Sequence, residues 1–147
     1  MIGIAAIAFN GVIGNGGKLP WNVPGDLKWF KEITNNSILL VGRNTFNTLP
    51  PLKNREIWVL TKNPIANNEI KTPEDLVNKH NKQVFLAGGS MIYSSYMHLC
   101  DAFYVTHIDG EFNGDAYFDD KFFSMFKEIA LIREGDGFVV KSYSRIT

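Results

Sequence analysis

Asp26 is the residue of this chain best placed to handle a proton. Pro24 lies two positions before it, and proline fits the first turn of a helix but cannot continue one, so a helix is predicted to start there. Leu27 and Phe30 share the helical surface next to Asp26 and make it apolar. Because burying an unpaired carboxylate on an apolar surface costs free energy, we expect Asp26 to interact with a ligand.

Two glycine-containing segments, 42–45 and 88–91, each follow a predicted strand and open a predicted helix. Free amides at helix N-termini attract anions, and glycine lets a phosphate approach the backbone closely. Two such segments at the carboxyl ends of parallel strands fit the two phosphates of a dinucleotide. For either segment alone, an ordinary turn glycine is the alternative.

Standard phosphate-binding patterns do not fit the chain. Neither glycine segment has the G-x-G-x-x-G pattern, which disfavours a standard Rossmann site. The stretch 14–19 is similar to a P-loop only superficially, because Val12 stands at the first glycine position and Leu19 replaces the metal-binding hydroxyl. A P-loop kinase is therefore disfavoured.

Several polar side chains follow predicted strands or turns. Arg43, Thr61 and Lys62 follow two neighbouring strands and together suit an additional phosphate, although each alone is consistent with a solvated surface residue. Arg55 precedes a strand and suits bidentate capture of a carboxylate, with a plain surface arginine as the alternative.

Thr106 lies within an apolar strand, where a buried hydroxyl needs a hydrogen-bond partner. We hypothesise that it pairs with Asp26; a backbone partner is the alternative. No metal-like spacing connects the three histidines, so we expect no metal site and give no catalytic role to His80, His98 or His107.

The elements that position these residues alternate along the chain. Apolar runs predict buried strands at 2–9, 38–41, 57–60, 84–87 and 102–108. Helices are predicted at about 25–35, after Gly42 up to Pro50-Pro51, from Thr72-Pro73, and near 90–97. This alternation predicts a parallel sheet.

Two further segments complete the predicted architecture. Residues 10–24 contain four glycines and two prolines and predict a long functional loop. The runs 126–134 and 138–146, joined by 135–137, predict a terminal hairpin. The prediction is a mixed α/β fold with a mostly parallel central sheet, flanking helices and a C-terminal antiparallel hairpin.

Composition limits the classes of protein that fit. The 147 residues suit one domain, 1–147, and 45% hydrophobic residues support a packed core. A net charge of zero without a basic tract argues against a nucleic-acid partner. The apolar N-terminus is too short to span a bilayer, and Cys100 is the only cysteine, so we expect a cytoplasmic protein without a membrane partner.

The chain closely resembles the dihydrofolate reductase family of short bacterial or phage type. The resemblance covers essentially the whole chain and rests on ordered motifs at 12–14, 19–30, 41–46, 87–93, 104–108 and 114–115. It implies hydride transfer from NADPH to C6 of 7,8-dihydrofolate with protonation at N5, giving tetrahydrofolate. It also implies a monomer.

The resemblance assigns roles residue by residue. Asp26 matches the catalytic acid, Thr106 would orient it, and Trp21 would help hold water near it. The substrate pocket would comprise Asp26 and Thr106 with Ile4, Ala5, Leu27, Phe30, Leu49, Leu52 and Arg55, the arginine holding the glutamate tail. The cofactor site would comprise Ala6, Ile13, Gly14, Asn15, Leu19, Gly42, Arg43, Asn44, Thr45, Leu60, Thr61, Lys62, Gly88, Gly89, Ser90, Met91 and Ile92. Residues 14–23 would act as a lid.

The chain departs from the family pattern in three places. The region between Thr48 and Arg55 is short and lacks a second tail-contacting arginine. The lid is rich in glycine. Ser90 and Met91 provide no basic side chain, which leaves the phosphates to backbone amides.

Two rival functions are weighed against a reductase of dihydrofolate. A pyrimidine reductase of riboflavin synthesis shares the fold but gives no reason for Asp26 between Trp21 and Phe30. A non-catalytic folate- or nucleotide-binding module predicts binding without turnover, and binding alone does not require Asp26, Trp21 and Thr106 together.

Overall fold

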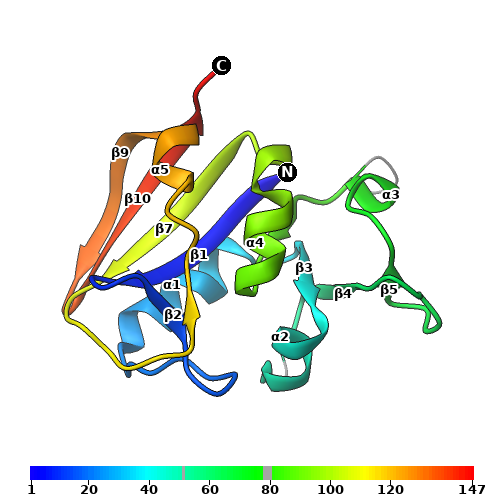
Figure 1. Ribbon diagram of the computed structural model, residues 1–147, viewed down its shortest axis with the longest axis horizontal. Helices are drawn as coiled ribbons and strands as arrows, with labels where there is room; N and C mark the ends of the chain where they lie inside the picture. Colours follow the sequence, from blue (N-terminus) through cyan, green and yellow to red (C-terminus); the bar gives the residue numbers. More distant parts are fainter. Residues whose placement is uncertain (51, 78–80) are drawn as a thin grey trace.

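The computed structural model describes residues 1–50, 52–77 and 81–147. Its centre is an eight-stranded sheet with the strand order β5-β4-β3-β6-β1-β7-β10-β9 (Figure 1). The strands from β5 to β7 pair in parallel, and β10 pairs antiparallel with both β7 and β9. The predicted parallel sheet with a C-terminal antiparallel hairpin is confirmed.

The five apolar runs all form central strands. The sheet consists of β1 (Ile2–Ala8), β3 (Ile38–Gly42), β4 (Glu56–Leu60), β5 (Glu69–Ile70), β6 (Val84–Leu86), β7 (Ala102–Ile108), β9 (Phe126–Gly135) and β10 (Phe138–Arg145). The residues of β3 are all buried, as expected for a strand covered on both faces.

The helices are short. They are α1 (Pro24–Ile33), α2 (Arg43–Thr48), α3 (Glu74–Val77), α4 (Ser90–Tyr96), α5 (Phe122–Met125) and the 3₁₀ turn η1 (Met97–Leu99). Helix α1 begins at Pro24, as predicted, and ends where the Thr34 hydroxyl donates to the Phe30 carbonyl at 2.6 Å. The predicted continuation of α3, with His80, and the helix-ending Pro51 lie outside the described residues.

Two parts of the prediction were wrong in detail. The segment 10–24 is not irregular throughout, because β2 (Val12–Gly14) pairs with β8 (Ala116–Tyr117) in a second sheet. The elements β5, β8 and α5 were not predicted either. Each has only two to four residues, too few to show a hydrophobic period.

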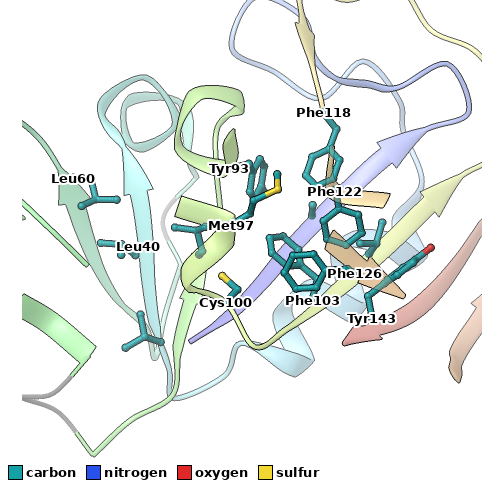
Figure 2. Packing of buried hydrophobic residues seen from close by; sticks show 14 of the residues in the cluster. Leu40, Leu60, Tyr93, Met97, Cys100, Phe103, Phe118, Phe122, Phe126 and Tyr143 are labelled. Atoms are coloured by element: carbon teal, nitrogen blue, oxygen red, sulfur yellow. The ribbon is translucent and has the colours of Figure 1, made fainter. Parts of the chain in front are cut away.

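Aromatic side chains fill one face of the sheet (Figure 2). Phe103 of β7 packs edge-to-face on Phe122 and Phe126, with ring centroids 4.9 and 5.2 Å apart. A Cβ atom at Gly3 would lie 2.1 Å from the Phe103 ring, so only glycine fits beside it. This packing fixes β1 against β7, the two strands beneath the candidate site.

Helix α1 covers the opposite face of the sheet, behind β1 in Figure 1. Its Trp29 packs edge-to-face on Tyr104 of β7, with ring centroids 5.6 Å apart. Packing of this kind sets the distance between α1 and β7, and so the position of Asp26 above the sheet. Within the described part of the chain, no helix has the length and apolar character needed to cross a membrane.

Candidate active site

Asp26 lies in the first turn of α1 and is only 7% exposed. The Trp21 indole Nε1 donates toward Asp26 Oδ2 at 3.4 Å, and the Thr106 hydroxyl is a second hydrogen-bond donor to the same carboxylate. Thr106 itself is 2% exposed. The structure therefore brings these three residues together, and Trp21 contacts the acid directly, whereas the resemblance implied a role in holding water.

The surroundings of Asp26 change its acidity. Burial raises the pKa of the carboxyl above the ordinary aspartate value of 3.8, while the hydrogen bonds from Trp21 and Thr106 lower it in part. Both donors are neutral, so no positive charge compensates for the lost hydration. The carboxyl consequently holds a proton at higher pH than an exposed aspartate does.

A cleft of about 890 Å³ opens beside Asp26. Five of its lining residues were predicted, namely Leu19, Trp21, Asp26, Leu27 and Arg55. Lys28, Lys31 and Asn35 also line the cleft and were not predicted. The four-residue spacing from Leu27 to Lys31 and on to Asn35 is the signal that could have identified two of them.

The other predicted substrate residues lie deeper or to one side. Ile4, Phe30 and Leu52 pack in one apolar cluster with Leu39 and Phe85. Ala5 belongs to the large core cluster, and Leu49 is a half-buried residue that caps the end of α2. These five predicted side chains are therefore not among the residues that line the cleft, whose lining comes from α1, the segment before it, Asn35 and Arg55.

Arg55 is held in a fixed orientation at the cleft. Its Nε donates to the Thr34 hydroxyl oxygen at 3.0 Å, and its terminal nitrogens donate to the carbonyls of Lys31 and Lys53. The guanidinium is thus tied to the C-terminal end of α1. An arginine whose orientation is fixed in this way is preorganised for a carboxylate.

The two glycine segments lie side by side at the carboxyl ends of β3 and β6. The Gly42 amide donates to the Gly88 carbonyl at 2.9 Å. An added Cβ would lie 2.8 Å from Ile92 Cγ1 at Gly42, and 3.1 Å from the Thr45 hydroxyl oxygen at Gly89. Glycine is therefore favoured at both positions, where the segments 42–45 and 88–91, together called the glycine cradle, pack closely against each other.

The remaining residues predicted around this cradle range from buried to exposed. Ser90 donates its hydroxyl to the Tyr117 carbonyl at 2.8 Å, and Met91 is 78% exposed. Asn44 is exposed, and Leu60 is buried at the end of β4. Tyr93, which was not predicted, donates its hydroxyl to the Ile4 carbonyl at 2.6 Å and so ties α4 to β1.

Arg43 and Thr61 each come directly after the last paired residue of their strand. The register of β3 and β4 places Gly42 opposite Leu60, so both residues lie at the same end of the sheet. Thr61 is half-buried and Lys62 is exposed. Arg43 does not stand free in solvent: its guanidinium forms an ion pair with Glu69 and lies 5.6 Å from the Phe46 ring centre. Glu69 was not predicted from the sequence.

The predicted lid starts from β2. Asn15 and Lys18 exchange two backbone hydrogen bonds, at 2.8 and 3.1 Å, and close a glycine turn. The Gly16 amide donates to both carboxylate oxygens of Asp115 at 3.2 Å. Ile13, Gly14 and the neighbouring Ala6 of β1 are half-buried, and Leu19 is 54% exposed at the cleft.

Comparison with known proteins points to one family. The family model for dihydrofolate reductase matches residues 1–137. A dihydrofolate reductase from Buchnera aphidicola is 37% identical over 124 residues, covering 80% of this chain and 77% of the relative. A dihydrofolate reductase from Mycoplasma pneumoniae is 32% identical over 142 residues, covering 86% and 89%.

A solved structure shows the same fold. Dihydrofolate reductase from Enterococcus faecalis, in complex with NADP(H) and RAB-propyl, matches with a TM-score of 0.86 and 32% identity. The match covers 98% of this chain and 95% of that chain. The α/β fold, the buried acid and the glycine cradle are features of a nucleotide-dependent reductase. The chain belongs to the dihydrofolate reductase family.

Proposed function

We propose that the chain catalyses the NADPH-dependent reduction of 7,8-dihydrofolate to 5,6,7,8-tetrahydrofolate. Family membership supports the reaction, and one observation carries it: a buried carboxyl, Asp26, faces a cleft of about 890 Å³. The glycine cradle of β3 and β6 supplies a second, separate site for a dinucleotide. This reduction supports one-carbon and thymidylate metabolism.

The chain itself supplies positioning and a proton. When bound, NADPH supplies the hydride that is transferred to C6 of the substrate. Asp26 binds the pterin ring and holds the proton that reaches N5; its raised pKa keeps part of the carboxyl protonated nearer to neutral pH. Thr106 and Trp21 orient the carboxyl, and the apolar cluster with Ile4, Phe30 and Leu52 keeps water from the sheet beneath α1.

The other predicted residues bind the glutamate tail of dihydrofolate and the phosphates of NADPH. Arg55 binds the α-carboxylate of the glutamate tail, in the orientation that Thr34 and two carbonyls give it. The cradle holds the pyrophosphate through backbone amides, and residues 14–23 close over the nicotinamide. Arg43, Thr61 and Lys62 bind the 2′-phosphate.

One chain contains all of these residues, so a monomer is sufficient for activity. We take residues 1–147 as one domain, because the central sheet includes strands from both ends of the chain. The neutral net charge argues against nucleic acid as a partner, and the single, buried Cys100 suits a cytoplasmic protein.

The test follows NADPH absorbance with purified protein and 7,8-dihydrofolate. We expect consumption of NADPH that requires both the protein and the folate. Folded protein that binds both compounds without consuming NADPH would indicate a binding module and overturn the proposal. Consumption with a riboflavin precursor but not with dihydrofolate would indicate the pyrimidine reductase.

A further inference from the structure

Glu69 is an acid built into the predicted 2′-phosphate site. It is the first residue of β5, opposite Val59 of β4, and its side chain is only 10% exposed. It lies one residue before Ile70, whose carbonyl accepts the Thr61 amide at 2.9 Å. A carboxylate therefore stands where an incoming anion would meet Arg43 and Thr61.

The two carboxylate oxygens of Glu69 have different partners. Oε1 accepts the amides of Ile65 and Ala66, at 2.9 and 3.2 Å. Oε2 forms the ion pair with Arg43. One oxygen thus organises the loop after Thr61 and Lys62, and the other occupies the arginine.

These contacts keep Glu69 ionised. The amides of Ile65 and Ala66, followed by the side chain of Arg43, hold the pKa of the carboxyl below its usual value of 4.5. At neutral pH the charge of Arg43 is accordingly balanced by a permanent negative charge. The Arg43 side chain is still 44% exposed, so an anion can reach its other N–H groups.

We propose that Glu69 determines how strongly this chain prefers NADPH to NADH, and that it weakens the preference. A phosphate dianion that binds Arg43 must share the guanidinium with Glu69 and is repelled by its carboxylate. NADH carries no 2′-phosphate and is not affected in this way. This inference rests on the proposed function, because it requires a dinucleotide whose 2′-phosphate lies at Arg43.

The test is the isosteric substitution Glu69→Gln. The glutamine Oε1 can still accept the Ile65 and Ala66 amides, so the loop keeps its shape while the negative charge is lost. Dissociation constants for NADPH and NADH are measured by protein fluorescence at low salt, without folate and without turnover. We expect NADPH to bind about three- to tenfold more tightly and NADH to change less than about twofold.

Two controls separate this effect from a general change in charge. Glu56→Gln removes another carboxylate that pairs with a basic side chain, Lys82 at 3.2 Å, from the far end of β4. It should leave both constants unchanged. In an Arg43→Ala background, Glu69→Gln should no longer strengthen NADPH binding, because its effect depends on releasing the guanidinium.

Weaker NADPH binding in Glu69→Gln, or equal changes for NADPH and NADH, would overturn the inference and show that Glu69 only supports the loop. High salt should reduce the gain, since the effect is electrostatic. Failure of the proposed function looks different, because the wild-type protein would then consume no NADPH with dihydrofolate, whatever its affinities for the two nucleotides. If wild type binds NADPH and Glu69→Gln is unchanged, only the inference about Glu69 is wrong.

Discussion

Asp26 in the first turn of α1 and Glu69 at the start of the edge strand β5 are two acids whose pKa values are displaced in opposite directions. Asp26 of α1 is buried with the neutral donors Trp21 and Thr106, so the loss of hydration dominates and its pKa rises. Glu69 receives two backbone amides and an arginine, so its pKa falls. Asp26 can therefore hold a proton, whereas Glu69 remains negatively charged.

The comparison shows that burial and the type of hydrogen-bond partner together decide whether a carboxyl can hold a proton. Neutral donors orient a carboxylate without balancing its charge, so a buried carboxyl such as that of Asp26 can still take up a proton. A guanidinium and backbone amides stabilise the ionised form of a carboxyl and lower its pKa, so the group stays charged at neutral pH. Substitution of the two acids, and of the two donors to Asp26, tests this difference.

The largest effect is expected for Asp26→Asn, which removes the proton donor and retains the shape of the side chain. The rate of NADPH oxidation with dihydrofolate at pH 7 should fall by about 10²- to 10⁴-fold, the usual contribution of a general acid. NADPH binding, measured by fluorescence, should not change because Asp26 lies outside the glycine cradle. Near wild-type turnover would show that another group supplies the proton.

A smaller effect is expected for Trp21→Phe, which keeps an aromatic ring and removes the Nε1 donor to Asp26. Turnover should fall about tenfold, in line with the loss of one hydrogen bond to a charged group. Since this bond lowers the pKa of Asp26, its loss should move the fall of activity with pH to higher pH. A pH–rate profile identical to that of wild type would exclude this orienting role.

Thr106→Val should have the next smaller effect, about three- to fivefold on turnover, because it removes the weaker of the two donors. The pH–rate profile should move in the same direction as for Trp21→Phe. Thr48→Val is a matched control, since Thr48 is exposed and donates only to carbonyls of its own helix. If Thr48→Val lowered turnover as much as Thr106→Val does, the lower turnover would reflect a general effect on folding and not the hydrogen bond to Asp26.

The smallest effects concern stability, and they should have opposite signs for the two acids. A raised pKa means that the folded state binds more protons, so the contribution of Asp26 to stability falls as pH rises above about 4. Asp26→Asn should therefore exceed wild type by about 1 kcal/mol in unfolding free energy at pH 7 and lose that advantage in acid.

Glu69 should behave in the reverse way. Its lowered pKa gives stability that is present above 4.5 and lost as pH falls, so Glu69→Gln should be less stable than wild type at pH 7 and match it in acid. Urea unfolding at several pH values measures both differences. Differences of the same sign for both acids would contradict the comparison between them.

The sequence alone was sufficient to predict the central strands and the position of Asp26, but it did not predict the role of Glu69. Continuous apolar runs identified the central strands, and Pro24 identified the start of α1 and the position of Asp26. Glu69 could not be found in this way, because β5 has two residues and shows no hydrophobic period. Its partner Arg43 lies 26 positions earlier, and only the pairing of β3, β4 and β5 brings them together.

The pKa of the Asp26 carboxyl is the quantity that tests the central claim most directly. It can be measured by ¹³C NMR titration of protein labelled at aspartate carboxyl carbons, with Asp26→Asn used to assign the signal. We predict a midpoint above the ordinary value of 3.8 that moves higher in Trp21→Phe. A midpoint at or below 3.8 would show that the buried carboxyl is permanently ionised and would contradict its role as the proton donor.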